Sequence, residues 1–211
     1  MNSFNLTQPL LPPHSETIGM RDLKGLMKAH LKQWDSVLSA VYLSELDQAF
    51  VAWGLIAIAI FSTAQFSPLS WTTQAMLDAA LTGVGIAGTS GLTWQIAHIA
   101  QLRWVVFLWA TLMTSGMIIT AYGIFGGVGL ILINLCPLWL GLCAAGYLAM
   151  SVGMRSRCFS ACAVVHGLAI AGLEIYPGWQ FFTSGLVMAL TLFFFSVVPW
   201  DMRAIEAEEP C

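Results

Sequence analysis

Long apolar runs, interrupted by single charged residues or by glycine and proline, make up most of the chain after residue 46. Between residues 48 and 200 the charged side chains are Asp78, Arg103, Arg155, Arg157 and Glu174. A helix of about 20 apolar residues crosses the hydrocarbon core of a bilayer, which is about 30 Å thick. We therefore predict six transmembrane helices, at residues 48–66, 75–100, 104–125, 128–152, 158–175 and 180–200.

The segment before these runs has a different pattern. Within residues 17–46, apolar residues such as Leu23, Met27 and Leu31 recur at three- and four-residue spacing, which predicts an amphipathic helix. A second row, also at four-residue spacing, consists of Lys24, Lys28 and Lys32. Such a helix can lie in the membrane interface with its lysines near anionic lipid headgroups, or it can pack on the cytoplasmic side of the protein.

These patterns divide the chain into four parts. They are a flexible proline-rich tail at 1–16, the amphipathic helix at 17–46, a six-span transmembrane domain at 47–201 and a short acidic cytoplasmic tail at 202–211. The expected fold class is therefore all-α, a polytopic helical bundle in a membrane.

Composition strengthens the membrane interpretation. Hydrophobic residues make up 58% of the chain and charged residues only 9%, whereas about 25% of the residues in soluble domains are charged. The net charge of -3 is small, and the basic residues do not alternate with aromatic residues on a polar surface. We therefore expect the lipid bilayer as a partner and exclude nucleic acid.

The basic residues also predict sidedness. With six spans, all eight lysines and arginines fall on one side of the membrane. Cytoplasmic segments carry an excess of lysine and arginine, so we expect both termini of this multi-pass protein to be cytoplasmic.

The second predicted span is rich in small residues. A row on one face consists of Ala80, Gly83, Ala87 and Gly91. Small side chains let transmembrane helices approach closely. We therefore predict that this row is a helix-packing surface and that the span lies near the centre of the bundle.

Four ionisable residues are the intramembrane polar candidates, namely Asp78, His98, His166 and Glu174. Ionisable groups at membrane depth are costly and tend to face a partner or a water-filled path. Asp78 and Glu174 have a simpler explanation as well, since both fall near predicted span ends, where water reaches them.

The fifth span also suggests a metal. Cys158, Cys162 and His166 follow one another at four-residue spacing and so share one helix face. Thiolates and imidazole bind soft metals such as copper(I) or zinc, although cysteine is also an ordinary packing residue.

The histidines and lysines bear on two organic cofactors, haem and retinal. A haem between His98 and His166 would have to bridge a difference in depth of about 6 Å, from the rise of 1.5 Å per residue. Retinal is excluded, because every lysine precedes residue 33 and a retinal Schiff base needs a lysine inside a span.

No catalytic motif is present, and the connections between spans are short, so we expect a non-catalytic protein. The shortage of polar residues in the spans favours an accessory subunit or assembly factor that packs against another membrane protein or a second copy of itself. One alternative is a small ion, metal or proton transporter or channel that uses the four ionisable residues. The other is a haem- or quinone-linked redox protein.

Overall fold

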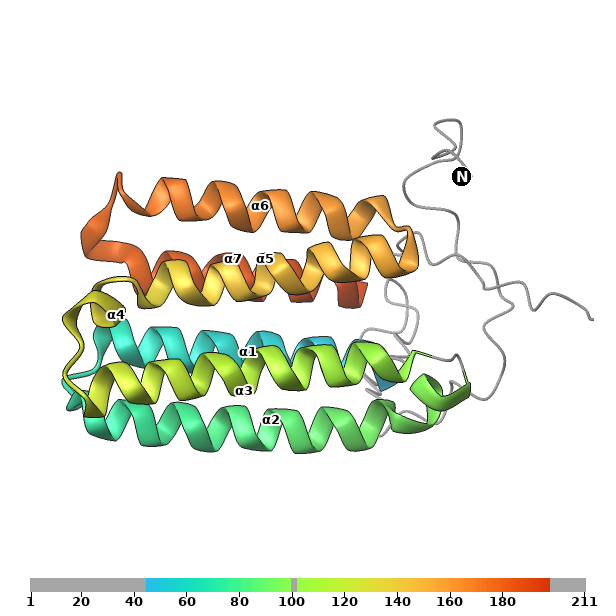
Figure 1. Ribbon diagram of the computed structural model, residues 1–211, viewed down its shortest axis with the longest axis horizontal. Coiled ribbons are helices and arrows are strands. Elements are labelled where there is room, and N and C mark those ends of the chain that lie inside the picture. The colour runs from blue at the N-terminus through green and yellow to red at the C-terminus, as the bar shows by residue number, and fades with distance from the viewer. Residues whose placement is uncertain (1–44, 100–101, 198–211) are drawn as a thin grey trace, which may run out of the picture.

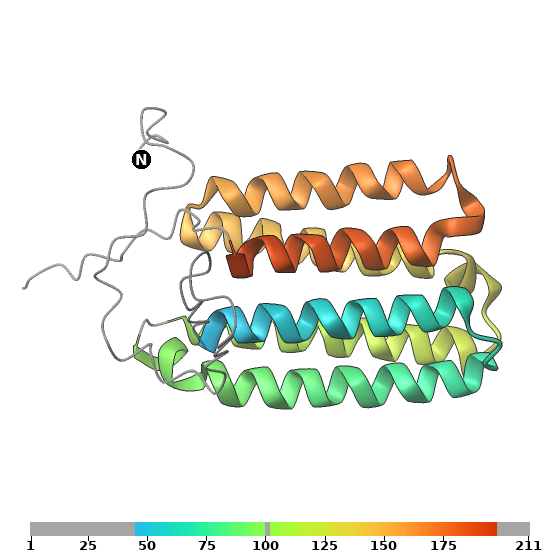
Figure 2. The same cartoon turned by 180° about the vertical axis from the view of Figure 1, so that it is seen from behind.

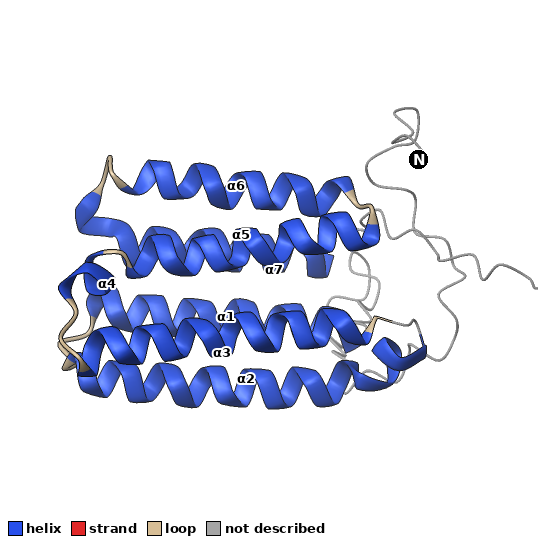
Figure 3. Cartoon of the chain, viewed as in Figure 1, coloured by secondary structure: helices blue, strands red, loops and turns tan. Residues whose placement is uncertain are grey.

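The computed structural model describes residues 45–99 and 102–197, and these residues form helices joined by short connections (Figure 3). The elements in chain order are α1 (Glu45–Phe66), α2 (Trp71–Ile99), α3 (Arg103–Phe125), α4 (Gly129–Ile133), α5 (Leu135–Met154), α6 (Arg157–Leu173), the 3-10 helix η2 (Pro177–Trp179) and α7 (Gln180–Val197). The prediction of an all-α fold is confirmed for this part of the chain.

The six long helices run along a common direction and form a flattened bundle (Figures 1 and 2). Each helix packs on its neighbours in a closed order, α1 with α2, α2 with α3, α3 with α5, α5 with α6, and α7 with both α6 and α1. Additional contacts between α5 and α7 fill the interior. The helices α2 and α6 therefore lie at opposite edges of the bundle.

Local sequence explains where the helices start and stop. Ser70 caps α2, because its hydroxyl oxygen accepts a hydrogen bond from the Thr73 amide at 3.2 Å. Gly127, with φ of 63°, adopts a left-handed conformation after α3 that costs glycine little. Arg155 ends α5 in the same conformation, with φ of 51°.

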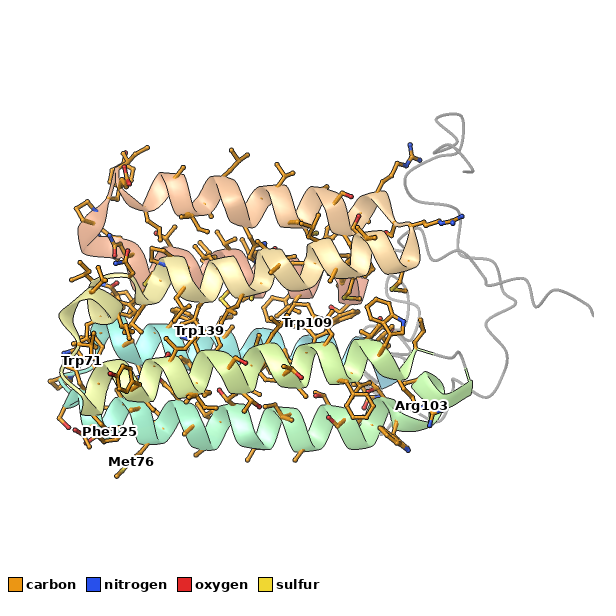
Figure 4. The ribbon with its side chains drawn as sticks, viewed as in Figure 1. Trp71, Met76, Arg103, Trp109, Phe125 and Trp139 are labelled. Carbon is orange, nitrogen blue, oxygen red and sulfur yellow. The ribbon has the colours of Figure 1, made fainter. Side chains whose placement is uncertain are left out.

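Tryptophan and glycine meet repeatedly where α3 packs on α5. Trp104 and Trp109 of α3 lie over Gly153 and Gly146 of α5, and Trp139 of α5 lies over Gly116 of α3. Figure 4 shows Trp109 and Trp139 in the middle of the bundle.

The indole nitrogens of Trp109 and Trp139 are also hydrogen-bonded. Trp109 donates to the sulfur of Met150 at 3.1 Å, and Trp139 donates to Oγ1 of Thr120 at 3.2 Å. The polar ends of these large rings are thereby satisfied within the apolar core.

The outward faces of the helices are apolar as well. Large hydrophobic side chains exposed there include Leu55, Val84, Phe107, Ile118, Leu148, Leu168 and Leu190. Five helices among the described residues are long and apolar enough to cross a membrane: α1, α2, α3, α5 and the segment formed by η2 and α7. The protein therefore has the features of a multi-pass integral membrane protein.

The fifth predicted span, 158–175, corresponds to α6, an apolar helix of 17 residues. The prediction of one span over 128–152 is wrong at its start, since the helix is interrupted at Asn134 and the long helix α5 begins at Leu135. Pro137 explains the interruption, because it has no N–H to bond to the Ile133 carbonyl oxygen and is tolerated only in the first turn of a helix, which is here the first turn of α5. The Asn134 side chain donates to the Leu130 carbonyl oxygen at 2.8 Å, at the end of α4.

The predicted helix at 17–46 lies almost wholly outside the described residues, and so do Lys24, Lys28 and Lys32. The tails at 1–16 and 202–211 lie outside them as well.

Candidate functional site

A polar cluster joins α1 and α2 near the connection between them. Gln74 is at its centre and only 4% of its surface is exposed. Its side-chain nitrogen Nε2 faces three oxygen atoms, the Asp78 carboxylate oxygen Oδ1 at 2.8 Å, Thr63 Oγ1 at 2.9 Å and the Ile60 carbonyl oxygen at 3.2 Å. A primary amide has two hydrogens to donate, so three acceptors compete for them. We call these four residues the Gln74 cluster.

One further feature makes the Gln74 cluster unusual. The side-chain oxygen of Gln74, Oε1, is buried and has no hydrogen-bond partner. Buried polar atoms are nearly always hydrogen-bonded, because an unsatisfied one costs about 1–3 kcal/mol. The cluster is thus rich in acceptors and poor in donors.

A second polar group lies in the interior of the other half of the bundle. His166 of α6 is fully buried, and its Nδ1 lies 2.9 Å from the Cys162 carbonyl oxygen. Because a carbonyl can only accept, Nδ1 carries the proton, and Nε2 keeps a lone pair. No hydrogen-bond partner reaches Nε2. The imidazole ring lies 5.1 Å from the ring of Tyr147, centroid to centroid. His166 is thus held by one hydrogen bond and by aromatic packing.

The predicted soft-metal site is not assembled. Cys158 and Cys162 are buried like His166, but no group of three or more His, Cys, Asp or Glu side chains among the described residues is placed to hold a metal ion. The physical reason is the helix itself. Two ligands four residues apart can share an ion, but Cys158 and His166 are eight residues apart, about 12 Å along the axis, so one ion cannot bind all three side chains.

The four ionisable candidates are not brought together either. Asp78 lies on α2 and His166 on α6, at opposite edges of the bundle (Figure 1). Glu174 is exposed just after the last residue of α6. His98 belongs to the last turn of α2, where its side chain lies outside the described part. A relay through these residues therefore has no support from their positions.

No protein family, curated protein or solved structure matches this chain.

The row of small residues on α2 faces outward. Ala80, Gly83, Ala87 and Gly91 are all exposed. The expectation that this span lies near the centre of the bundle is wrong, since α2 packs mainly on α1 and α3 at one edge. The reason is that α2 uses its opposite face inward, with Gly85 packed against Trp53 and Ile56 of α1.

Sequence reasoning identified Asp78 but missed Gln74 and Thr63. Gln74 precedes Asp78 by four residues, the spacing at which helix side chains meet, and this signal was available in the sequence. The part played by Thr63 was not visible, because only the antiparallel pairing of α1 and α2 brings it to the same depth.

Proposed function

We propose that this chain is a non-catalytic accessory subunit or assembly factor of a membrane complex. In this proposal the outer face of α2 binds a transmembrane helix of a partner protein. The observation that carries the proposal is the space beside the glycines on that face. A Cβ atom added at Gly83, Gly88 or Gly91 would meet no atom within 4 Å.

The row of small residues makes α2 suited to close approach by another helix. Its outward positions include Ala79, Ala80, Gly83, Ala87, Gly88 and Gly91. In lipid, helices associate through close packing rather than through the hydrophobic effect, so small side chains mark contact faces. Met76 and Val84 also project from this face of α2, but they lie among six small residues. On the outer face of α6, Val164, Val165 and Leu168 lie close together. Bulky branched side chains of that kind are typical of contact with lipid.

Six membrane crossings and a cytoplasmic location of both termini complete the proposal. A helix of 17 residues is about 25 Å long, at the short end of what spans a bilayer, so α6 can serve as the sixth crossing. Arg103, Arg155 and Arg157 belong to the α2–α3 and α5–α6 connections, which lie at the same end of the bundle. Figure 4 marks this end with Arg103. Positive residues favour the cytoplasmic side, which supports a cytoplasmic position for this end.

The test compares two leucine variants by native mass spectrometry of protein extracted from its host membrane in a mild detergent. Gly83→Leu fills the space on the outer face of α2. Gly167→Leu is the matched control, since Gly167 is also exposed on a helix and also has open space around it. We expect the unmodified protein and Gly167→Leu to carry another membrane protein, and Gly83→Leu to lose it.

Other results would overturn the proposal in distinct ways. A lone protomer from the unmodified protein would contradict an accessory role. Retention of the partner by Gly83→Leu would remove α2 from the interface. A homo-oligomer that only Gly83→Leu disrupts would show that the face pairs copies of this chain instead.

A further inference from the structure

We propose that the Gln74 cluster is a binding site for one monovalent alkali cation, held between α1 and α2 by the Asp78 carboxylate, Gln74 Oε1 and Thr63 Oγ1, with the Ile60 carbonyl oxygen beside them. This inference is independent of the proposed docking function. It rests on the charge of Asp78, on the excess of oxygen atoms and on the unpartnered oxygen of Gln74.

The charge of Asp78 has no counter-charge nearby. Within residues 45–99 and 102–197, its recorded partner is the neutral amide of Gln74. The arginines of the described residues belong to the other end of the bundle. Asp78 follows the first residue of α2 by seven positions, which places it about 10 Å along the helix. An anion at that depth is costly unless a cation or a proton neutralises it.

The oxygen atoms outnumber the hydrogens available to them. Thr63 directs its hydroxyl to its own helix, where the carbonyl oxygens of Ala59 and Ile60 lie at 2.8 and 2.9 Å. Nε2 of Gln74 then has two hydrogens for three acceptors. Clusters with surplus oxygen acceptors attract hard cations, which take oxygen ligands.

The buried Oε1 of Gln74 is the independent observation that points to a ligand. It has no partner in the protein, although it is fully enclosed. In an amide, the oxygen and the nitrogen are about 2.2 Å apart, from the standard bond lengths. With Nε2 only 2.8 Å from Asp78 Oδ1, Oε1 therefore lies within about 5 Å of that carboxylate oxygen. One ion with metal–oxygen distances of about 2.5 Å, within the range of about 2.3–2.6 Å found for calcium, spans about 5 Å and can therefore touch both.

The single carboxylate of the Gln74 cluster favours a monovalent ion over a divalent one. Asp78 is the one acidic member of the Gln74 cluster, and no group of three His, Cys, Asp or Glu side chains assembles among the described residues. Calcium and magnesium sites in proteins commonly use more than one carboxylate. Asp78 is only half-buried, and the exposed hydroxyls of Ser70 and Thr73 lie at the start of α2, the nearer end of the helix, from which an ion would enter.

The first test measures thermal unfolding of the full chain in detergent by tryptophan fluorescence. Sodium chloride or potassium chloride replaces choline chloride at constant ionic strength. We expect a saturable rise in the unfolding temperature with at least one of the two alkali ions, because a ligand that binds the folded state stabilises it. Comparison of the two salts tells sodium from potassium.

Two variants locate the effect. Asp78→Asn keeps an acceptor for Gln74 but removes the charge, and we expect its apparent affinity to fall about tenfold or more, as for loss of a charged contact. Thr89→Val is the matched control. Thr89 also links α2 to α1, accepting from Trp53 Nε1 at 3.1 Å, but it is far along the helix from Asp78. Thr89→Val is expected to keep the full response to the cation.

Direct binding of radioactive sodium and rubidium to the unmodified protein gives a readout that needs no variant. We expect about one ion per chain, displaced by the unlabelled salt. Equal unfolding temperatures in all three salts together with no saturable binding would overturn the inference. A full response in Asp78→Asn, or a response lost in Thr89→Val, would overturn it as well.

Discussion

Glycine has opposite surroundings in two regions of this protein. At the α1–α7 interface, a Cβ atom added at Gly54 would lie 2.5 Å from the ring of Phe193, and one added at Gly185 would lie 2.5 Å from Cβ of Phe61. On the outer face of α2, the same addition at Gly83, Gly88 or Gly91 meets nothing within 4 Å.

The difference shows that a row of small residues does not by itself reveal whether it lies at a helix contact within the fold or on the outer surface. At the α1–α7 interface, glycine permits a contact that the fold already makes. On α2 it leaves a surface to which another helix can come equally close. A series of single alanine substitutions turns this comparison into measurements, because each adds the same methyl group.

Gly185→Ala should have the largest effect. The added methyl group would meet Phe61 Cβ at 2.5 Å and the Ala57 carbonyl oxygen at 3.5 Å. Neither atom can move unless α1 moves with it, so we expect a loss of about 3 kcal/mol in the free energy of unfolding, at the upper end for an overpacked core. Reversible unfolding in mixed micelles measures it. An unchanged stability would mean that α1 and α7 are not packed closely.

Gly146→Ala should have an intermediate effect. Its added methyl group would meet the indole ring of Trp109 at 2.8 Å. This ring is held by its bond to Met150 and by the edge-on contact with Tyr147, whose centroid lies 5.2 Å away. A side chain can shift more easily than a backbone, so we expect a loss of about 2 kcal/mol. The same unfolding assay reports the change, and a loss greater than that of Gly185→Ala would reverse the proposed order.

Gly88→Ala should have the smallest effect and the opposite sign. Its added methyl group meets nothing within 4 Å, and alanine in a helix interior is favoured over glycine by about 0.5–1 kcal/mol. We therefore expect unchanged or slightly higher stability for the isolated chain. Clear destabilisation of the isolated protomer would show that this face is already in contact within the fold.

The two unsatisfied polar centres differ in a similar way. His166 of α6 is fully buried with its ring against Tyr147 of α5, and its Nε2 has no hydrogen-bond partner. In the Gln74 cluster the free amide oxygen lies close to a carboxylate near the end of a helix. Only the Gln74 cluster combines a charged group with several oxygen atoms.

The sequence by itself determined the membrane character, the helical fold and the positions of most helices. Long apolar runs leave a helix as the natural structure in lipid, because every backbone polar group must be satisfied within the segment. Proline at 68 and 177 and glycine at 127 marked connections. The break at Asn134 was missed, although Pro137 marks it, because a proline is tolerated only in the first turn of a helix and lacks the N–H that would bond to the Ile133 carbonyl oxygen.

Only the tertiary structure decided which face of each helix turns inward. In a soluble protein the polar face of a helix identifies its solvent side, but here both the interior and the lipid are apolar and the pattern carries little of that signal. For this reason the row from Ala80 to Gly91 was assigned to the middle of the bundle, although it faces outward. The pairing of Thr63 with Gln74 was likewise decided by helix packing, because residues eleven positions apart meet only when two helices run antiparallel.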